Sequence, residues 1–254
     1  MDTQRDTFHV GTSGYHYRHW QGVFYPEGLR KREWLAYYAR HFDTVEINNT
    51  FYRLPSAETF AAWRAQVPAL FCYALKFSRY GSHLKRLRAP RESVTKFLDR
   101  AAQLGTALGP ILVQLPPRWD VRVERLKDFL AAAPRDYRWA LEFRDPRWLR
   151  ADVFALLESY NAALCIHDLI ADHPRRATAD WVYVRFHGGS EDGNYPDPVL
   201  AARAEEVVRY LSQGLEVFAY FNNDAHGYAV RNAMTLRQSV GGDRPRGAGP
   251  PRVR

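Results

Sequence analysis

Charged and amide side chains stand at the ends of apolar, strand-like stretches of this sequence. Residues 44–55 read TVEINNTFYRLP, in which Val45 and Ile47 suit a buried strand, whereas Glu46 and Asn48 do not. Alternate residues of a strand point to the same side, so Glu46 and Asn48 share one face and the two apolar residues share the other. A carboxylate and an amide are therefore expected side by side where this strand ends.

The same arrangement recurs in the other strand-like stretches. The polar residues at the ends of these stretches are Lys76; Gln114; Glu142 and Arg144; His167 and Asp168; Tyr183, Arg185 and His187; and Asn222, Asn223 and Asp224. The alternate positions are apolar, as Leu141 and Phe143 illustrate, and they suit packing against helices. Polar side chains thus crowd toward the carboxyl end of nearly every predicted strand.

These residue types indicate chemistry on an anion. We assign Glu46 and Glu142 as acid and base candidates and add His187 to the catalytic set, where it orients the substrate. The predicted substrate-binding residues are Asn48, Lys76, Gln114, Arg144, Arg185, Asn222 and Asn223. The cations of this set exceed its carboxylates by one charge, so a phosphate or carboxylate is expected near Arg144 and Arg185. The pattern predicts an enzyme, either a hydrolase or a lyase, that acts on a phosphate-containing substrate. Nucleic acid is one candidate for this substrate.

Three alternatives remain open from the sequence. A purely structural plug would pair Glu46 and Glu142 with Lys76, Arg144 or Arg185 inside the fold, because lone buried charges are costly. A glycosidase would place the same two carboxylates on either side of a sugar bond, although the arginines argue against a neutral sugar. A non-catalytic nucleic-acid-binding protein would rely on basic surface segments instead.

Alternating strand-like and helix-like segments must position these side chains. The predicted strands cover residues 8–14, 43–48, 71–78, 110–116, 137–144, 162–168, 181–188 and 215–224. The predicted helices cover residues 31–42, 56–67 (with Ser56 as N-cap), 90–105, 122–133, 151–160, 197–214 and 226–240, while residues 169–180 form a loop. Such alternation favours a parallel sheet. Eight units in about 250 residues predict an α/β fold, a closed TIM-type (β/α)8 barrel whose active site lies at the carboxyl ends of its strands.

The barrel is expected to be a single domain over residues 1–240, followed by a basic, disordered tail over residues 241–254 that is rich in Gly, Pro and Arg. An open doubly wound sheet is the alternative fold, but no glycine-rich phosphate fingerprint follows the first strand. The polar N-terminus lacks a signal-peptide core, and no stretch is long and apolar enough to cross a membrane, so we expect a cytoplasmic protein. Cys72 and Cys165 lie in apolar stretches and are expected to be buried thiols.

Basic and aromatic segments suggest further contacts. The net charge of +8 includes the tail and a cluster of Lys85, Arg86, Arg88 and Arg91, which either binds polyanions or forms an ordinary solvated surface. The loop after the first strand carries Tyr15, Tyr17, Trp20, Phe24 and Tyr25, which either pack onto the barrel or stack on a base or sugar ring. An anionic small molecule or a nucleic acid is the expected partner, and the sequence leaves the oligomeric state open.

Several motifs, in order, resemble one family closely. GTSGYHYRHWQGVFYP, VEINNTFYRLP, LVQLPP, LEFRDPRW, YVRFHG and YFNNDAHGYAVRNA are similar to signatures of the YecE-like proteins, domain of unknown function 72, from His9 to about Ala233, with Tyr15 where the family often has Trp. The resemblance implies a TIM-type barrel without an established activity.

The family's barrel also resembles the xylose-isomerase-like group, which includes metal-dependent endonucleases acting at abasic sites. That analogy would imply metal ligands among Glu46, Glu142, His167, Asp168 and His187. No pair of these has the tight spacing of a metal motif, so we assign no metal ligand and name no cofactor.

Overall fold

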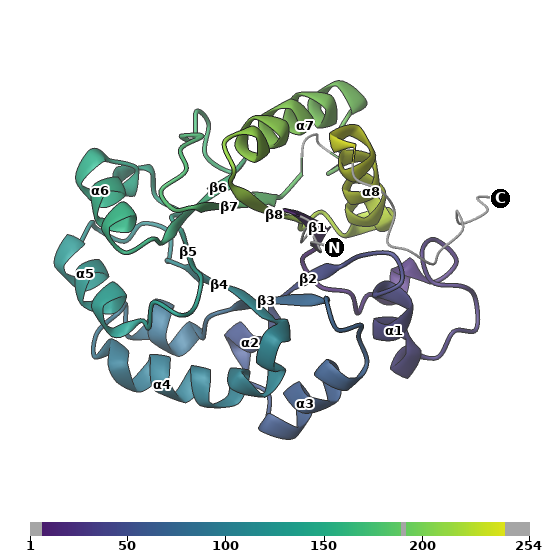
Figure 1. Cartoon of the computed structure of the whole chain (residues 1–254), viewed down its shortest axis with the longest axis horizontal. Coiled ribbons are helices and arrows are strands. Elements are labelled where there is room, and N and C mark those ends of the chain that lie inside the picture. The colour runs from purple at the N-terminus through teal and green to yellow at the C-terminus, as the bar shows by residue number, and fades with distance from the viewer. Residues whose placement is uncertain (1–6, 189–191, 242–254) are drawn as a thin grey trace, which may run out of the picture.

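The computed structural model describes residues 7–188 and 192–241, which form eight parallel strands arranged as a nearly closed barrel (Figure 1). The strands are β1 (Phe8–Thr12), β2 (Thr44–Ile47), β3 (Cys72–Lys76), β4 (Leu108–Gln114), β5 (Trp139–Glu142), β6 (Ala163–His167), β7 (Trp181–Phe186) and β8 (Glu216–Phe221). Their order around the sheet is β1-β8-β7-β6-β5-β4-β3-β2, so consecutive strands from β2 to β8 are hydrogen-bonded neighbours, β8 adjoins β1, and β1 and β2 stand at the two ends. The predicted α/β barrel is confirmed.

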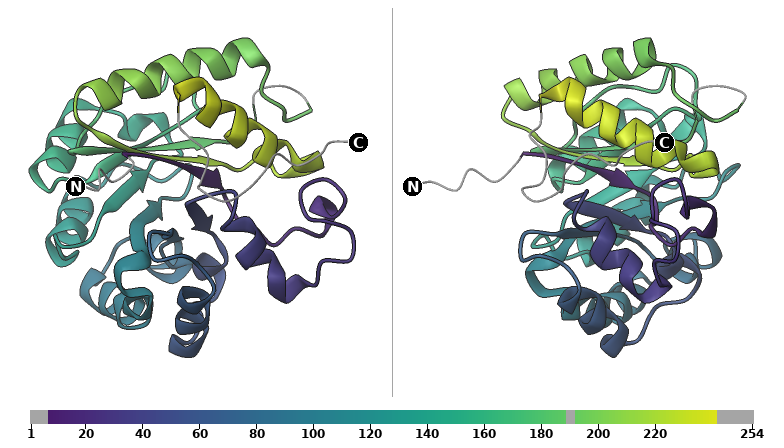
Figure 2. Two further views of the ribbon diagram at one scale, coloured as in Figure 1. Left: turned by 45° about the vertical axis from the view of Figure 1, so that its right-hand side comes forward. Right: turned by 90° about the vertical axis from the view of Figure 1, so that its right-hand side faces the viewer.

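Helices surround the strands on the outside of the barrel (Figures 1 and 2). They are α1 (Trp34–Tyr38), α2 (Asn49–Tyr52), α3 (Ala57–Ala65), α4 (Pro90–Ala101), α5 (Val123–Ala132), α6 (Ala151–Ser159), α7 (Asp197–Ser212) and α8 (Tyr228–Val240). The 3₁₀-helical segments are η1 (Arg18–Trp20), η2 (Lys31–Glu33), η4 (Ala102–Ala107), η5 (Pro146–Trp148) and η6 (Ala225–Gly227), and η3 (Tyr80–Leu84) is a short π-helix. Residues 169–180, between β6 and β7, contain no helix, as predicted.

Local sequence explains where these helices begin and which face they bury. The Ser56 hydroxyl accepts a hydrogen bond from the Thr59 amide at 3.3 Å, which confirms the predicted N-cap of α3. Pro90 opens α4, where its missing N–H costs nothing. Val94 and Phe97 of α4 are buried at a helical spacing of three residues, so this face packs on the sheet.

The apolar residues form two separate layers. One layer lies between the strands and the helices and includes Val45, Leu75 and Leu141. The other fills the barrel lumen and contains Ala74, Leu112, Ala140, Ala163, Cys165, Trp181, Tyr183, Phe218 and Tyr220. The strand phase expected from the sequence is therefore correct, because the lumen set alternates with the outward set along each strand. Both cysteines are free thiols.

The barrel closes between β1 and β2 through a tyrosine hydroxyl. The Tyr38 hydroxyl accepts a hydrogen bond from the Thr12 amide at 2.9 Å and donates one to the Thr44 carbonyl at 3.1 Å. A Cβ atom on Gly11 would stand 2.3 Å from the Thr44 carbonyl oxygen, so the two strands approach this closely because residue 11 has no side chain. A side chain from α1 thus replaces part of the backbone ladder at this seam.

The sequence also predicts a basic tail and no membrane-spanning helix. Residues 242–254, which include nearly all of the predicted basic tail, lie outside the described residues. Within residues 7–188 and 192–241, no helix combines the length and the apolar character that a membrane span requires.

Candidate active site

A buried arginine joins two carboxylates at the carboxyl end of the strands. Arg185, near the end of β7, donates from Nη2 to Glu46 Oε1 at 2.8 Å and from Nη1 to Glu142 Oε2 at 2.7 Å. The two glutamate side chains are fully buried, and the arginine side chain is 2% exposed. This Glu46–Arg185–Glu142 triad links β2, β7 and β5 across the lumen.

Glu46 is surrounded by donors. Besides Arg185, its Oε1 accepts from the Ser13 hydroxyl at 2.6 Å and from Asn48 Nδ2 at 3.1 Å. Its Oε2 accepts from the Tyr183 hydroxyl at 2.6 Å. Four hydrogen bonds compensate the cost of burying this carboxylate. The acceptor capacity of Glu46 is therefore largely used within the protein.

Glu142 has a similar environment with more positive charge. Gln114 Nε2 lies 3.1 Å from each of its oxygens, and Arg144 Nε donates to Oε1 in a close ion pair. Burial raises the pKa of the Glu142 carboxyl, but the charges of Arg185 and Arg144 outweigh burial and hold the pKa well below its usual range. Glu142 is consequently ionised at neutral pH.

Lys76 differs from the other charged residues of the site because it has no carboxylate partner among the residues that the structure describes. It ends β3, is 8% exposed, and holds its ammonium 4.5 Å from the centre of the Phe51 ring, in a cation–π contact. Burial and the charge of Arg185 lower the pKa of Lys76 to about 8. The side chain is therefore largely protonated at pH 7 and releases its proton more easily than an ordinary lysine.

His83 stands beside this lysine. Its ring lies 4.9 Å from the ring of Phe51, and burial together with the charges of Lys76 and Arg79 lowers the pKa of His83 to about 4. The imidazole is thus neutral at physiological pH. Neither Phe51 nor His83 was predicted from the sequence as a site residue.

His187 is a neutral donor directed at the triad. Asn222 Nδ2 lies 3.3 Å from His187 Nδ1, so with this amide orientation the ring proton resides on Nε2. His187 Nε2 lies 3.8 Å from Glu142 Oε1 and is buried without a hydrogen-bond partner among the described residues. Burial and the charge of Arg185 lower the pKa of His187 to about 3. Its backbone is held by the Asp168 carboxylate, which accepts from the His187 amide at 3.0 Å.

Two histidines near His187 have structural partners. His167 Nε2 lies 2.9 Å from the Phe143 carbonyl, and the rings of His167 and His173 are 4.5 Å apart. Burial lowers the pKa of both imidazoles, that of His173 to about 4. Within the described residues, no group of three or more His, Cys, Asp or Glu side chains is arranged to hold a metal ion.

The structure thus brings most of the residues singled out in the sequence into one region. Glu46, Asn48, Gln114, Glu142, Arg144 and Arg185 share one hydrogen-bonded network. Lys76 and His187 adjoin this network, and Asn222 contacts His187. Asn223 does not join it, because consecutive residues point in opposite directions; its Nδ2 donates to Asn232 of α8 and to the Gly193 carbonyl. The catalytic and binding roles stay predictions.

Ser13 is a contact of Glu46 that the sequence interpretation missed. It directly follows β1, lies within the predicted strand 8–14 and has the same phase as His9 and Gly11, so continuing the alternation to residue 13 would have placed it in the lumen. Tyr183 was correctly placed on the inner face, but its bond to Glu46 depends on the closed barrel.

The aromatic loop after β1 packs against the barrel. Trp20, Phe24 and Tyr25 are buried, and Tyr25 stacks on Trp34 of α1 with ring centres 4.8 Å apart. These rings belong to the core, which agrees with the packing alternative. Tyr17 is partly exposed and donates its hydroxyl to the Ser13 carbonyl at 2.6 Å.

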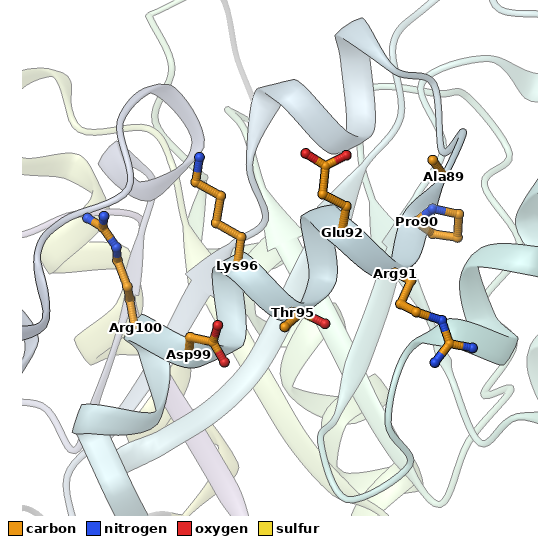
Figure 3. Close-up of a pocket in the computed structure, with 8 residues that line it drawn as sticks. All are labelled: Ala89, Pro90, Arg91, Glu92, Thr95, Lys96, Asp99 and Arg100. Atoms are coloured by element: carbon orange, nitrogen blue, oxygen red, sulfur yellow. The ribbon is translucent and has the colours of Figure 1, made fainter.

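A wide hollow of about 810 Å³ lies away from this network, along the outer face of α4 (Figure 3). It is lined by Ala89, Pro90, Arg91, Glu92, Thr95, Lys96, Asp99 and Arg100. Side chains of both charges project from this single helix face. We assign no chemistry to it, since it contains none of the predicted catalytic or substrate-binding residues.

Fold and geometry define a (β/α)8-barrel protein with a polar, cation-rich region at the carboxyl ends of its strands. We call this region, which contains Lys76, Arg144 and His187 around the Glu46–Arg185–Glu142 triad, the mouth of the barrel. A model of the family described as "Protein of unknown function DUF72" matches residues 9–253, and the chain therefore belongs to the DUF72 family. The UPF0759 protein YecE of Escherichia coli (strain K12) is 36% identical over 115 residues, 45% of this chain, and the chain spans 42% of that relative's length. The UPF0759 protein YunF of Bacillus subtilis (strain 168) is 26% identical, with 84% of this chain and 88% of that protein covered.

Solved structures agree with this assignment. A DUF72 family protein of Thermotoga maritima superimposes with a TM-score of 0.83 and 28% identity, covering 92% of this chain and 99% of the other. A DUF72 family protein of Enterococcus faecalis has a TM-score of 0.77 at 21% identity, covering 92% and 95%. A xylose isomerase-like TIM barrel/4-hydroxyphenylpyruvate dioxygenase fusion protein has a TM-score of 0.54 at 14% identity, covering 82% and 40%, and shares the fold alone.

Proposed function

We propose that this protein is an enzyme that binds an anionic, phosphate-containing substrate in the barrel mouth and acts on it there as a hydrolase or lyase. The observation that carries the proposal is the charge balance of the mouth. Arg185 and Arg144 pair with Glu46 and Glu142, so these two cations balance the two carboxylates. Lys76 adds a third positive charge that has no carboxylate partner among the described residues. An anion contacting Lys76 and Arg144 would neutralise charge that the described residues leave uncompensated.

Each residue has a role in this proposal that follows from its contacts. Lys76 and the quarter-exposed Arg144 hold the anion and stabilise charge that develops on it. The Nε2–H of His187 and the Oδ1 of Asn48 orient the substrate, because both atoms are buried without a partner among the described residues. Gln114 and Asn222 set the positions of Glu142 and His187.

The two glutamates are assigned a supporting role in this proposal. Their oxygens are occupied by donors, and a carboxylate as strongly stabilised as Glu142 is a weak base. We infer that Glu46 and Glu142 hold Arg185 and fix the strand ends. Lys76, whose pKa of about 8 is close to physiological pH, then becomes the acid–base candidate of the mouth.

This arrangement gives less support to a glycosidase. Arg185 lies between the two carboxylates and bonds to both, so a sugar bond flanked by them would have to displace a buried guanidinium group. A non-catalytic nucleic-acid-binding protein remains the second candidate, favoured by the basic loop 85–91. The two free cysteines support a reducing, cytoplasmic setting for either function.

Calorimetry with pyrophosphate tests the binding step. Lys76→Gln removes one charge-assisted contact, so affinity should fall by about 10- to 150-fold, the equivalent of about 1.5–3 kcal/mol. The matched control is Lys96→Gln on the exposed outer face of α4, which should bind like the wild type (Figure 3). A bound anion raises the pKa of Lys76, so binding near pH 8.5 should also take up protons, visible as a heat that depends on the buffer.

Two outcomes would contradict the proposal. Equal affinity of the Lys76 variant and the wild type would show that the anion binds elsewhere. Binding without release of 4-nitrophenol from aryl phosphate mono- and diesters would remove the hydrolase assignment and leave the binding protein as the better candidate.

A further inference from the structure

A second hollow, which we call the basic hollow, lies on the rim of the barrel at the carboxyl end of the strands. It has a volume of about 300 Å³. Among the described residues, its lining contains five cations, Lys85, Arg86, Arg88, Arg122 and Arg125, and one acidic residue, Asp120. The first three residues belong to the loop between β3 and α4, and the others to the segment that leads from β4 into α5. Loops that follow parallel strands gather at their carboxyl ends, where barrels build their sites.

The charges of this basic hollow are poorly compensated. Asp120 Oδ1 accepts a hydrogen bond from Arg147 Nη1 at 2.7 Å, and the ammonium of Lys85 lies 3.9 Å from Glu92 Oε2. Arg86, Arg88, Arg122 and Arg125 form no ion pair with any residue that the structure describes. Partial desolvation and the neighbouring charges of Arg88 and Arg122 lower the pKa of Arg125, which reflects repulsion within the cluster.

The start of α5 adds to the positive potential. Arg122 is the N-cap of this ten-residue helix and has no side-chain capping bond, and Arg125 is its third residue. The amino end of a helix carries unpaired N–H groups and a partial positive charge, which acidic residues normally stabilise. Glu124 is the acidic residue of this first turn, and the two arginines beside it leave the helix start with a net positive charge. Guanidinium groups and backbone N–H groups at a helix start together form a good environment for phosphate.

The backbone bordering the hollow is also unusual. Arg86, Leu87 and Ala89 have φ values of 49°, 62° and 43°, and Arg118 on the opposite loop has 54°. These are four of the seven non-glycine residues with positive φ in the described chain, so left-handed backbone is concentrated around this hollow. Such conformations carry strain in residues with a side chain and cluster at binding sites.

A single helical turn connects the basic hollow to the mouth. His83 of η3 contacts Phe51, whose ring lies under the ammonium of Lys76. The next residue, Leu84, lines the basic hollow and is 64% exposed. A ligand that occupies both the mouth and the basic hollow therefore has to extend only across η3.

We propose that the basic hollow is a second phosphate subsite, which binds another phosphate group of a substrate whose reacting part occupies the mouth. This inference rests on the proposed function of the mouth, and it adds that the substrate carries more than one phosphate. The recognised chemistry is a phosphate group presented by either a small polyphosphate or a phosphodiester chain.

The test compares two double variants of the full-length chain. Arg88→Gln/Arg122→Gln removes two exposed guanidinium groups from the hollow, and Lys96→Gln/Lys127→Gln removes two exposed charges from α4 and α5 outside it. Binding of tripolyphosphate is measured by calorimetry, and binding of a fluorescent ten-nucleotide single strand by anisotropy over a range of salt concentrations. Lys76→Gln in the same assays reports on the mouth independently.

The hollow variant should bind at least one probe tenfold or more weakly than the control variant. If the single strand is affected, the slope of log K against log salt should become shallower by about 1.4, because each lost phosphate contact with a single strand contributes about 0.7. The probe that is affected identifies the source of the phosphate.

Equal binding by the two double variants would overturn the subsite, and so would a wild-type protein that binds neither probe. If Lys76→Gln weakens binding while the hollow variant does not, the proposed function stands without the second subsite. If the hollow variant weakens binding while Lys76→Gln does not, the basic hollow binds phosphate and the assignment of the mouth as a phosphate site fails.

Discussion

Replacing Glu46 by Gln should destabilise the fold, because the carboxylate is a buried acceptor with four donors around it. The substitution keeps the shape and removes the charge. The amide can keep an oxygen toward Ser13, Asn48 and Arg185, but its NH₂ group then faces the Tyr183 hydroxyl, which now has to accept instead of donate. Arg185 also loses one of its two carboxylate partners and retains Glu142.

The size of the effect follows from these contacts. Breaking a buried ion pair by removing one partner costs about 3–5 kcal/mol. Because Glu142 still compensates Arg185, the lower part of this range applies, and we expect a loss of about 3 kcal/mol in the free energy of unfolding. For a domain of this size, a melting temperature lower by roughly 6–12 °C corresponds to that loss.

Urea unfolding followed by circular dichroism measures the loss, provided that the transition is two-state. Glu33→Gln is the matched control: its carboxylate pairs with Arg30 at 3.0 Å on the exposed surface, and its removal should leave the free energy of unfolding nearly unchanged. In Glu46→Gln/Arg185→Met, the second substitution should recover part of the loss. A loss below about 1 kcal/mol for Glu46→Gln alone would refute the supporting role and restore Glu46 as an acid–base candidate.

Three further perturbations test separate parts of the structure. Burial lowers the pKa of His9, but Asp43 and Glu216 outweigh burial and raise the pKa from 6.5 to about 9. A raised folded-state pKa stabilises the protein fully below the unfolded value, so about 3 kcal/mol should be lost between pH 6.5 and 9, and His9→Gln should abolish this loss in urea unfolding. Lys76→Met should stabilise the protein by about 3 kcal/mol at pH 7, because the lowered folded-state pKa of Lys76 costs the wild type this much. The gain should vanish as pH rises from 8 to 10.5, where the unfolded wild type holds a proton that the folded state has released, and a gain that is independent of pH would contradict the assigned cause. Tyr38→Phe removes the hydroxyl that joins β1 to β2 and should cost about 1–3 kcal/mol in thermal unfolding, with faster amide exchange at Thr12 as the local sign of an opened seam.

The barrel could be predicted from the sequence because its strands follow a simple rule. Apolar residues such as Val45 and Leu141 alternate with inward positions, and each strand is followed by a helical or loop segment of suitable length. The short helix α2 was missed, since four residues are too few for a helical period to show. Its position matters, because Phe51 of α2 lies under the ammonium of Lys76.

The partners of the inward residues could not be predicted in the same way. The phase of a strand tells which face a side chain occupies, whereas pairing depends on the register between strands that are distant in sequence. Glu46 and Arg185 are 139 residues apart, and their contact requires the closed barrel. For the same reason the sequence could not show which cation of the site would lack a carboxylate partner. Among the residues that the structure describes, that cation is Lys76.

The charged residues at the carboxyl end of the barrel form two layers that we expect to have different roles: the buried Glu46–Arg185–Glu142 triad stabilises the fold, and Arg144 and Lys76 above it bind the substrate. In the lumen, one arginine is shared by two carboxylates, a balance that leaves a single negative charge to attract the cations above it. Arg144 pairs with Glu142, whereas Lys76 contacts the Phe51 ring and has a pKa lowered to about 8. A buried layer of this kind can fix the ends of β2, β5 and β7 rigidly, and precise positioning of groups above a rigid base favours catalysis. The stability of the triad and the reactivity of the mouth are therefore expected to respond to different substitutions, and a variant that lowers one without the other would separate the two layers experimentally.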